Sequence, residues 1–115
     1  MFGNTAQALF GRAVILIKGK HYTEAASLLH SAVKLAPDQA NFHHYLGYAL
    51  WKLDHWRQAQ AEFEKAHKLE PKDPYTCYFL ARYGGTRKNC WRALCAENIP
   101  DDLYQALSGR AREHR

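Results

Sequence analysis

The stretches LLHSAVKLAPDQ (residues 28–39) and EFEKAHKLEPKD (residues 62–73) share one pattern of apolar, small and charged residues, and they begin 34 residues apart. The same shift pairs similar residues elsewhere in the chain: Leu16 with Leu50, Tyr22 with Trp56, Ala25 with Ala59, Leu29 with Phe63, Ala32 with Ala66, and Pro37 with Pro71. A period of this length is typical of two antiparallel helices with their turns. The sequence therefore predicts stacked helix pairs.

Small and apolar residues recur at helical spacing in both halves of the second copy. They are Leu46, Leu50 and Leu53 in the first half, and Ala59, Phe63 and Ala66 in the second. Pro37 and Pro71 are expected to end the second helix of each pair, because proline lacks an N–H and clashes with the preceding turn. Asp73 then offers a cap to the next helix, and Pro74 suits its first turn.

Seven helices are predicted, near residues 5–18, 22–35, 39–52, 55–69, 74–83, 87–98 and 101–112. The expected turns inside the pairs are Gly19-Lys20, Leu53-Asp54 and Gly84-Gly85. A third copy begins at Pro74 but fails at Pro100, which falls where a helical alanine is expected.

Composition indicates one folded domain and excludes a disordered chain, since 47% of the 115 residues are hydrophobic and 13% are aromatic. The net charge of +5 is concentrated in residues 1–37 and 82–115, whereas a nucleic-acid domain more often has one dense basic stripe. No apolar run approaches the ~20 residues of a membrane span, and no signal-peptide pattern is present. We therefore expect a cytoplasmic protein.

The repeated residues resemble the tetratricopeptide repeat family. The second copy matches its pattern through Leu46-Gly47, Leu50, Ala59, Phe63, Ala66 and Pro71, with His43 in place of the first aromatic residue. The first copy matches through Ala13, Leu16, Ala25, Leu29, Ala32 and Pro37, with Arg12 in place of leucine. The resemblance implies an all-α, right-handed helical-repeat array. It would form a single domain over residues 1–115, with repeats at 6–39 and 40–73, a degenerate third at 74–99 and a capping helix at 100–113.

Members of the family present fixed positions of the first helix of each pair to a ligand in a concave groove. The resemblance therefore implies that the partner-binding residues are Phe10, Val14, Ile17, Asn41, His44, Tyr48, Trp51, Tyr75, Tyr78 and Arg82. This set is rich in aromatic residues, which favours the apolar side chains of a protein partner. The alternative is that several of these rings pack against neighbouring helices.

We expect an adaptor or chaperone that holds a segment of a partner protein. The two-carboxylate clamp of heat-shock co-chaperones is absent, because Phe10, Val14, Tyr45, Tyr75 and Phe79 occupy its positions. The chain is similar in size to small stand-alone members that serve as chaperones for bacterial type III secretion subunits. The apolar stripe of the first helix is a second candidate contact, for a homodimer. The alternative function is single-stranded RNA binding, with aromatic residues and Arg82 stacking on bases.

We expect neither enzymatic activity nor a cofactor, because no catalytic constellation or phosphate-binding loop is recognisable. We also expect no metal site. His43 and His44 are adjacent on one helix and point about 100° apart, and His67 lies on another helix. Cys77, Cys90 and Cys95 lack metal-ligand spacing and are predicted to be inert buried thiols, which suits a reducing compartment.

Overall fold

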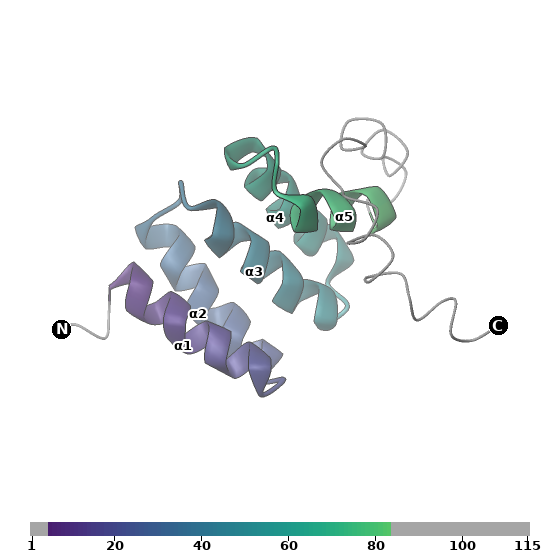
Figure 1. Cartoon of the computed structure of the whole chain (residues 1–115). Helices are drawn as coiled ribbons and strands as arrows, with labels where there is room; N and C mark the ends of the chain where they lie inside the picture. The colour runs from purple at the N-terminus through teal and green to yellow at the C-terminus, as the bar shows by residue number, and fades with distance from the viewer. Residues whose placement is uncertain (1–4, 84–115) are drawn as a thin grey trace. The chain divides into compact units, whose positions relative to one another are not determined.

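The computed structural model describes residues 5–83, which form five helices and no strand (Figure 1). The helices are α1 (Ala6–Lys18), α2 (Tyr22–Leu35), α3 (Ala40–Lys52), α4 (Trp56–Leu69) and α5 (Pro74–Tyr83). They confirm the first five predicted helices to within one residue at each end. The expected helices at 87–98 and 101–112, and the turn at Gly84-Gly85, lie outside the described residues. The chain divides between Glu70 and Pro71, so α1–α4 and α5 are described separately.

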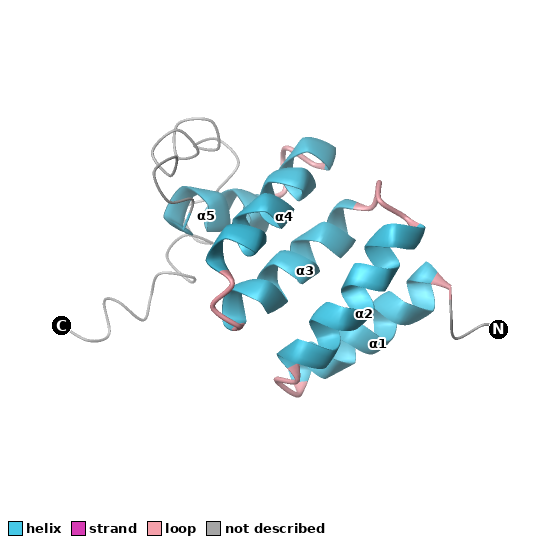
Figure 2. Ribbon diagram, turned by 180° about the vertical axis from the view of Figure 1, so that it is seen from behind, coloured by secondary structure: helices cyan, strands magenta, loops and turns pink. Residues whose placement is uncertain are grey.

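Helices α1 to α4 form two antiparallel pairs that stack through α2 and α3 (Figures 1 and 2). One buried cluster joins three of the helices: Leu9 of α1, Ala32 of α2 and Phe42 of α3. Ala25 and Ala59, the small residues of the repeat, are both buried, as expected where two helices approach closely.

The two turns inside the pairs have the same geometry, 34 residues apart. Lys20 and Asp54 have φ values of 66° and 65°, in the left-handed region that favours glycine. The next residue donates its N–H back into the preceding helix in both turns, from His21 to the Leu16 carbonyl at 2.8 Å and from His55 to the Leu50 carbonyl at 2.9 Å. These bonds satisfy carbonyls that a helix end leaves without partners. The predicted turns at Gly19-Lys20 and Leu53-Asp54 are confirmed.

Proline and aspartate set the other helix boundaries as predicted. Helices α2 and α4 end at Leu35 and Leu69, two residues before a proline. The intervening Ala36 and Glu70 leave the helical region, with ψ near 80°, because a following proline disfavours it. At the start of α5, the Asp73 carboxylate accepts a bond from the Tyr75 N–H at 3.2 Å and one from the Thr76 hydroxyl at 2.8 Å.

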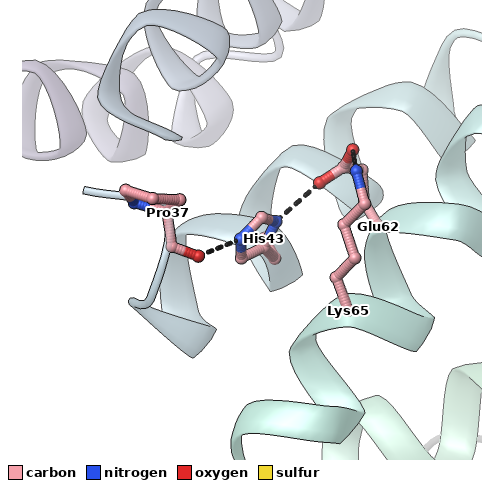
Figure 3. Close-up of polar contacts among 4 residues, drawn as sticks. All are labelled: Pro37, His43, Glu62 and Lys65. Carbon is pink, nitrogen blue, oxygen red and sulfur yellow. Dashed lines mark hydrogen bonds and ion pairs between the residues drawn. The ribbon is translucent and has the colours of Figure 1, made fainter. Parts of the chain in front are cut away.

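His43 connects the end of the first pair to the second pair (Figure 3). Its imidazole is 4% exposed, and its Nε2 lies 2.7 Å from the carbonyl oxygen of Pro37, in the loop after α2. Its Nδ1 lies 2.8 Å from Oε1 of Glu62 on α4, whose other carboxylate oxygen accepts a bond from Lys65 at 3.3 Å. Both ring nitrogens of the buried imidazole therefore have an oxygen partner, one in the loop after α2 and one on α4.

Gly47 provides the close approach between α3 and α4. A Cβ atom at this position would lie 3.0–3.1 Å from three ring atoms of Phe63, which is itself buried. Contacts this short force the ring to move in a closely packed interior. The glycine of the repeat is therefore required here by packing between the helices of one pair.

Replacement of two helical glycines by alanine is expected to have opposite effects. Gly47→Ala should lower the free energy of unfolding by about 1–2 kcal/mol, because the new methyl group meets the Phe63 ring. Gly11→Ala, the matched control with nothing within 4 Å of its new Cβ, should raise it by ~0.5–1 kcal/mol through better helix propensity. Urea unfolding of both variants measures this, and an equal stabilisation of both would contradict the packing argument.

His43→Phe keeps a ring in place but removes both hydrogen bonds, and it should cost about 2–3 kcal/mol of stability because Glu62 and the Pro37 carbonyl lose their partner. Glu62→Gln and the double variant complete a thermodynamic cycle. We expect a coupling energy of ~1–2 kcal/mol from urea unfolding. Additive effects of the two substitutions would show that the His43–Glu62 contact contributes nothing.

Candidate functional site

Five rings from α1, α3 and α4 form a continuous series, which we call the aromatic row. Phe10 of α1 stacks on Phe42 with centroids 4.9 Å apart and meets the edge of Tyr45 at 5.2 Å. Tyr45 in turn meets His44 at 5.6 Å, and His44 meets Phe63 of α4 at 5.6 Å. Phe42 and Phe63 are buried, whereas Phe10, His44 and Tyr45 are half-buried and keep part of their surface in solvent. The row is thus anchored in the core and accessible in its middle.

A second group of rings, the tyrosine–tryptophan cluster, consists of Tyr22, Tyr48 and Trp51 with Lys52 beside them. The centroids of Tyr22 and Tyr48 are 6.3 Å apart, and those of Tyr48 and Trp51 are 5.8 Å apart. The Lys52 ammonium lies 5.0 Å from the centre of the Trp51 ring, within the range of a cation–π contact. Burial raises the pKa of Tyr48, and repulsion and hydrogen bonding from Tyr22 raise it further.

Most of the predicted partner-binding residues of α1 and α3 are half-buried, and Asn41 is exposed. The half-buried ones are Phe10, Val14, Ile17, His44, Tyr48 and Trp51. Tyr48 and Trp51 contact each other directly. Phe10 and His44 are joined through Tyr45. Tyr45 was not among the predicted binding residues. It occupies one of the positions that form the two-carboxylate clamp in other members of the family, and this position could have identified it.

The predicted residues of α5 differ in exposure. Tyr75 is 49% exposed and Arg82 is half-buried, but Tyr78 is only 3% exposed and packs against Phe79. The ring of Tyr78 is therefore buried, as are all six residues from Thr76 to Ala81, and its role in partner binding stays a prediction.

The charge on α1 and α3 is of one sign. These helices contain Arg12, Lys18 and Lys52 and no acidic residue. Arg12 lies two residues from Phe10, about 160° around α1, so Lys18 and Lys52 are the cations nearer to the half-exposed rings of these helices.

Three histidines of the second helix pair, His43, His44 and His67, lie in different surroundings. His43 is held by Glu62 and Pro37, whereas His44 belongs to the aromatic row. Burial lowers the pKa of His67 on α4. Within residues 5–83, no group of three or more histidine, cysteine or acidic residues is arranged to hold a metal ion.

Cys77 is fully buried and disulfide-bonded, which corrects the prediction that it is an inert thiol, while Cys90 and Cys95 lie outside the described residues.

Among the described helices, none has the length and apolar character needed to cross a membrane.

The repeat geometry agrees with a known family. The profile of the tetratricopeptide repeat family matches residues 16–82, which is more than half of the chain. This chain belongs to the tetratricopeptide repeat family. Tetratricopeptide repeats are scaffolds for protein–protein interaction, so the family indicates a protein-interaction role in general.

This tetratricopeptide repeat chain spans only part of the length of each relative that it matches. Bacteriophage adsorption protein A of Escherichia coli (strain K12) is 37% identical over 70 residues, which is 61% of this chain and 7% of that protein. A chain of the CopN–Scc3 complex has a TM-score of 0.76 at 19% identity, over 96% of this chain and 68% of that chain. MamA from Desulfovibrio magneticus RS-1, from residue 41 to its end, has a TM-score of 0.69 at 25% identity, over 83% of this chain and 52% of that chain.

Removal of the Tyr48 hydroxyl is expected to flatten the alkaline pH dependence of stability. The folded chain holds this proton more tightly than the unfolded chain, whose tyrosine pKa is near 10.0. The stability that the proton contributes is therefore present below that pH and is lost as the pH rises through the raised pKa. Urea midpoints measured across this range should fall less in Tyr48→Phe than in the unsubstituted chain.

The matched control is Tyr75→Phe, which removes a hydroxyl from an exposed ring. It should keep the pH profile of the unsubstituted chain. The same flattening in both variants would show that the enclosed position of Tyr48 is not its cause.

Proposed function

We propose that this protein is an adaptor or chaperone that holds a segment of a partner protein against α1 and α3. The observation that carries the proposal is the half-exposed part of the aromatic row together with the tyrosine–tryptophan cluster. Tyrosine and tryptophan are the residues that most often dominate binding energy at protein interfaces. The family supports the same general role.

The packing of the rings favours binding of a segment without large rearrangement. Phe10 is stacked on buried Phe42, His44 meets buried Phe63 edge to face, and Trp51 is flanked by Tyr48 and Lys52. Rings that are already fixed by neighbours lose little side-chain freedom when a ligand covers them. The apolar side chains of the partner would contact the rings, and its acidic groups would face Lys18 and Lys52.

The more specific role in this proposal is that of a secretion-type chaperone, which covers an aggregation-prone segment of its client until the client assembles. The small size and the aromatic surface support it, and the basic charge of the chain would select an acidic client segment. Asn41 of α3, and Tyr75, Tyr78 and Arg82 of α5, remain predicted partner-binding residues. A homodimer through the apolar residues of α1 is the competing use of this surface.

Selection of short peptides from a random displayed library on the full chain tests the proposal. Selected peptides should be enriched in apolar and acidic residues. Trp51→Ala should weaken binding of a selected peptide by about tenfold or more, as expected of an interface tryptophan. Ile17→Ala should weaken it by several-fold, through loss of apolar contact.

Ile15→Ala is the matched control, because Ile15 lies about 160° around α1 from Ile17 and is 69% exposed. It should leave peptide affinity unchanged. Equal losses in the two isoleucine variants, or no loss in Trp51→Ala, would contradict the assigned surface. Tight binding of single-stranded RNA at low salt that depends on Trp51 would instead favour the alternative function. Analytical ultracentrifugation of the unliganded chain separates a homodimer from a monomer.

A further inference from the structure

A second concave feature lies on α2 and α4, apart from the aromatic rings of α1 and α3. It is a pocket of about 370 Å³ lined by Val33, Pro37, His43, Lys65, Lys68 and Leu69. This volume is in the range of binding pockets, roughly 300–1,000 Å³. Three of its lining residues, Pro37, His43 and Lys65, are visible in Figure 3, where the imidazole lies between the loop after α2 and helix α4.

The surface of the pocket is mainly apolar and keeps hydrophobic groups in contact with water. Val33 is half-buried, Pro37 is exposed, and Leu69 is 39% exposed although leucine is normally buried. Transfer of an apolar side chain of a ligand onto this surface would remove both from water. The pocket therefore favours an apolar anchor.

The rim of the pocket is cationic. Lys65, Lys68 and Leu69 lie three and four residues apart and hence on one face of α4. Glu62 is already bound to His43 and to Lys65. Lys68 has no carboxylate partner among residues 5–83. The residues that line the pocket include two lysines and no acidic residue, so the two ammonium groups give the rim a positive charge.

We propose that this pocket binds an acidic segment of a partner protein through one apolar side chain, with a neighbouring carboxylate on Lys68. The apolar walls and the cationic rim are complementary to a leucine or phenylalanine flanked by aspartate or glutamate. A nucleic acid fits less well, because the lining has no arginine and no phenylalanine, tyrosine or tryptophan on which a base could stack. This site is independent of the surface on α1 and α3, so the chain could engage two segments at once.

The experiment uses the full chain and a fluorescein-labelled synthetic peptide in which two leucines alternate with aspartates and glutamates. A second peptide replaces the acids by their amides, and a third replaces the leucines by alanine. Fluorescence anisotropy should show binding of the first peptide, and affinity should be reduced about tenfold or more for each of the others. Because the surface on α1 and α3 is also proposed to take apolar and acidic segments, backbone NMR shifts are followed in the Trp51→Ala variant, where they should move on α2 and α4 rather than on α1.

Charge reversal at Lys68 provides the decisive variant. Lys68→Glu should weaken binding of the acidic peptide by about tenfold, since attraction becomes repulsion at the rim. Lys20→Glu is the matched control: it makes the same change in net charge at an exposed residue in the turn after α1, away from the pocket, and should reduce affinity by less than about twofold. Leu69→Ser should also weaken binding, by several-fold, through loss of apolar contact.

Several results would overturn the proposal. Equal losses in Lys68→Glu and Lys20→Glu would show attraction to the net charge alone. Unchanged binding in both Lys68→Glu and Leu69→Ser would place the peptide elsewhere. Stronger, Lys68-dependent binding of a single-stranded uridine oligonucleotide would assign the pocket to nucleic acid. Because Trp51→Ala should leave this binding unchanged, failure of the pocket and failure of the surface on α1 and α3 are distinguishable.

Discussion

A single buried side chain, His43, holds the loop between the two helix pairs against the second pair. Its two ring nitrogens reach the carbonyl of Pro37 and the carboxylate of Glu62, so one imidazole connects the loop after α2 to helix α4 (Figure 3). A buried polar network of this kind contributes to specificity only when every member has a partner. Here each ring nitrogen has one, and Lys65 satisfies the second oxygen of Glu62.

The same arrangement creates two chemically different surfaces from four helices. With α3 held between α2 and α4, rings from α1 and α3 contact one another as the aromatic row, and Tyr22 of α2 reaches Tyr48 of α3. On α2 and α4, the bonded His43 forms part of the wall of an apolar pocket with two lysines at its rim. One surface offers aromatic rings and the other an apolar pocket with ammonium groups, which suits contacts with different parts of a partner protein.

The repeat in the sequence predicted the helices accurately because their boundaries are determined locally. Proline ends α2 and α4 because of its own stereochemistry. Asp73 caps α5 because its carboxylate accepts a hydrogen bond from the N–H of Tyr75, only two residues away. The paired turns were also predictable, although Lys20 and Asp54 adopt a positive φ that side chains disfavour. The closing hydrogen bonds recur at both turns, which suggests that they compensate this cost.

The sequence by itself determined the fold class, the helix ends and the family, because period, proline and small-residue spacing act within one repeat. Only the tertiary structure decided which rings are accessible. Tyr78 and Tyr75 are three residues apart on α5, yet one is buried and the other is half exposed. Tertiary packing also assigned His43 its two partners and formed the pocket from residues of α2, α3 and α4. These properties depend on distances between segments that are far apart along the chain, and no local pattern of residues encodes such distances.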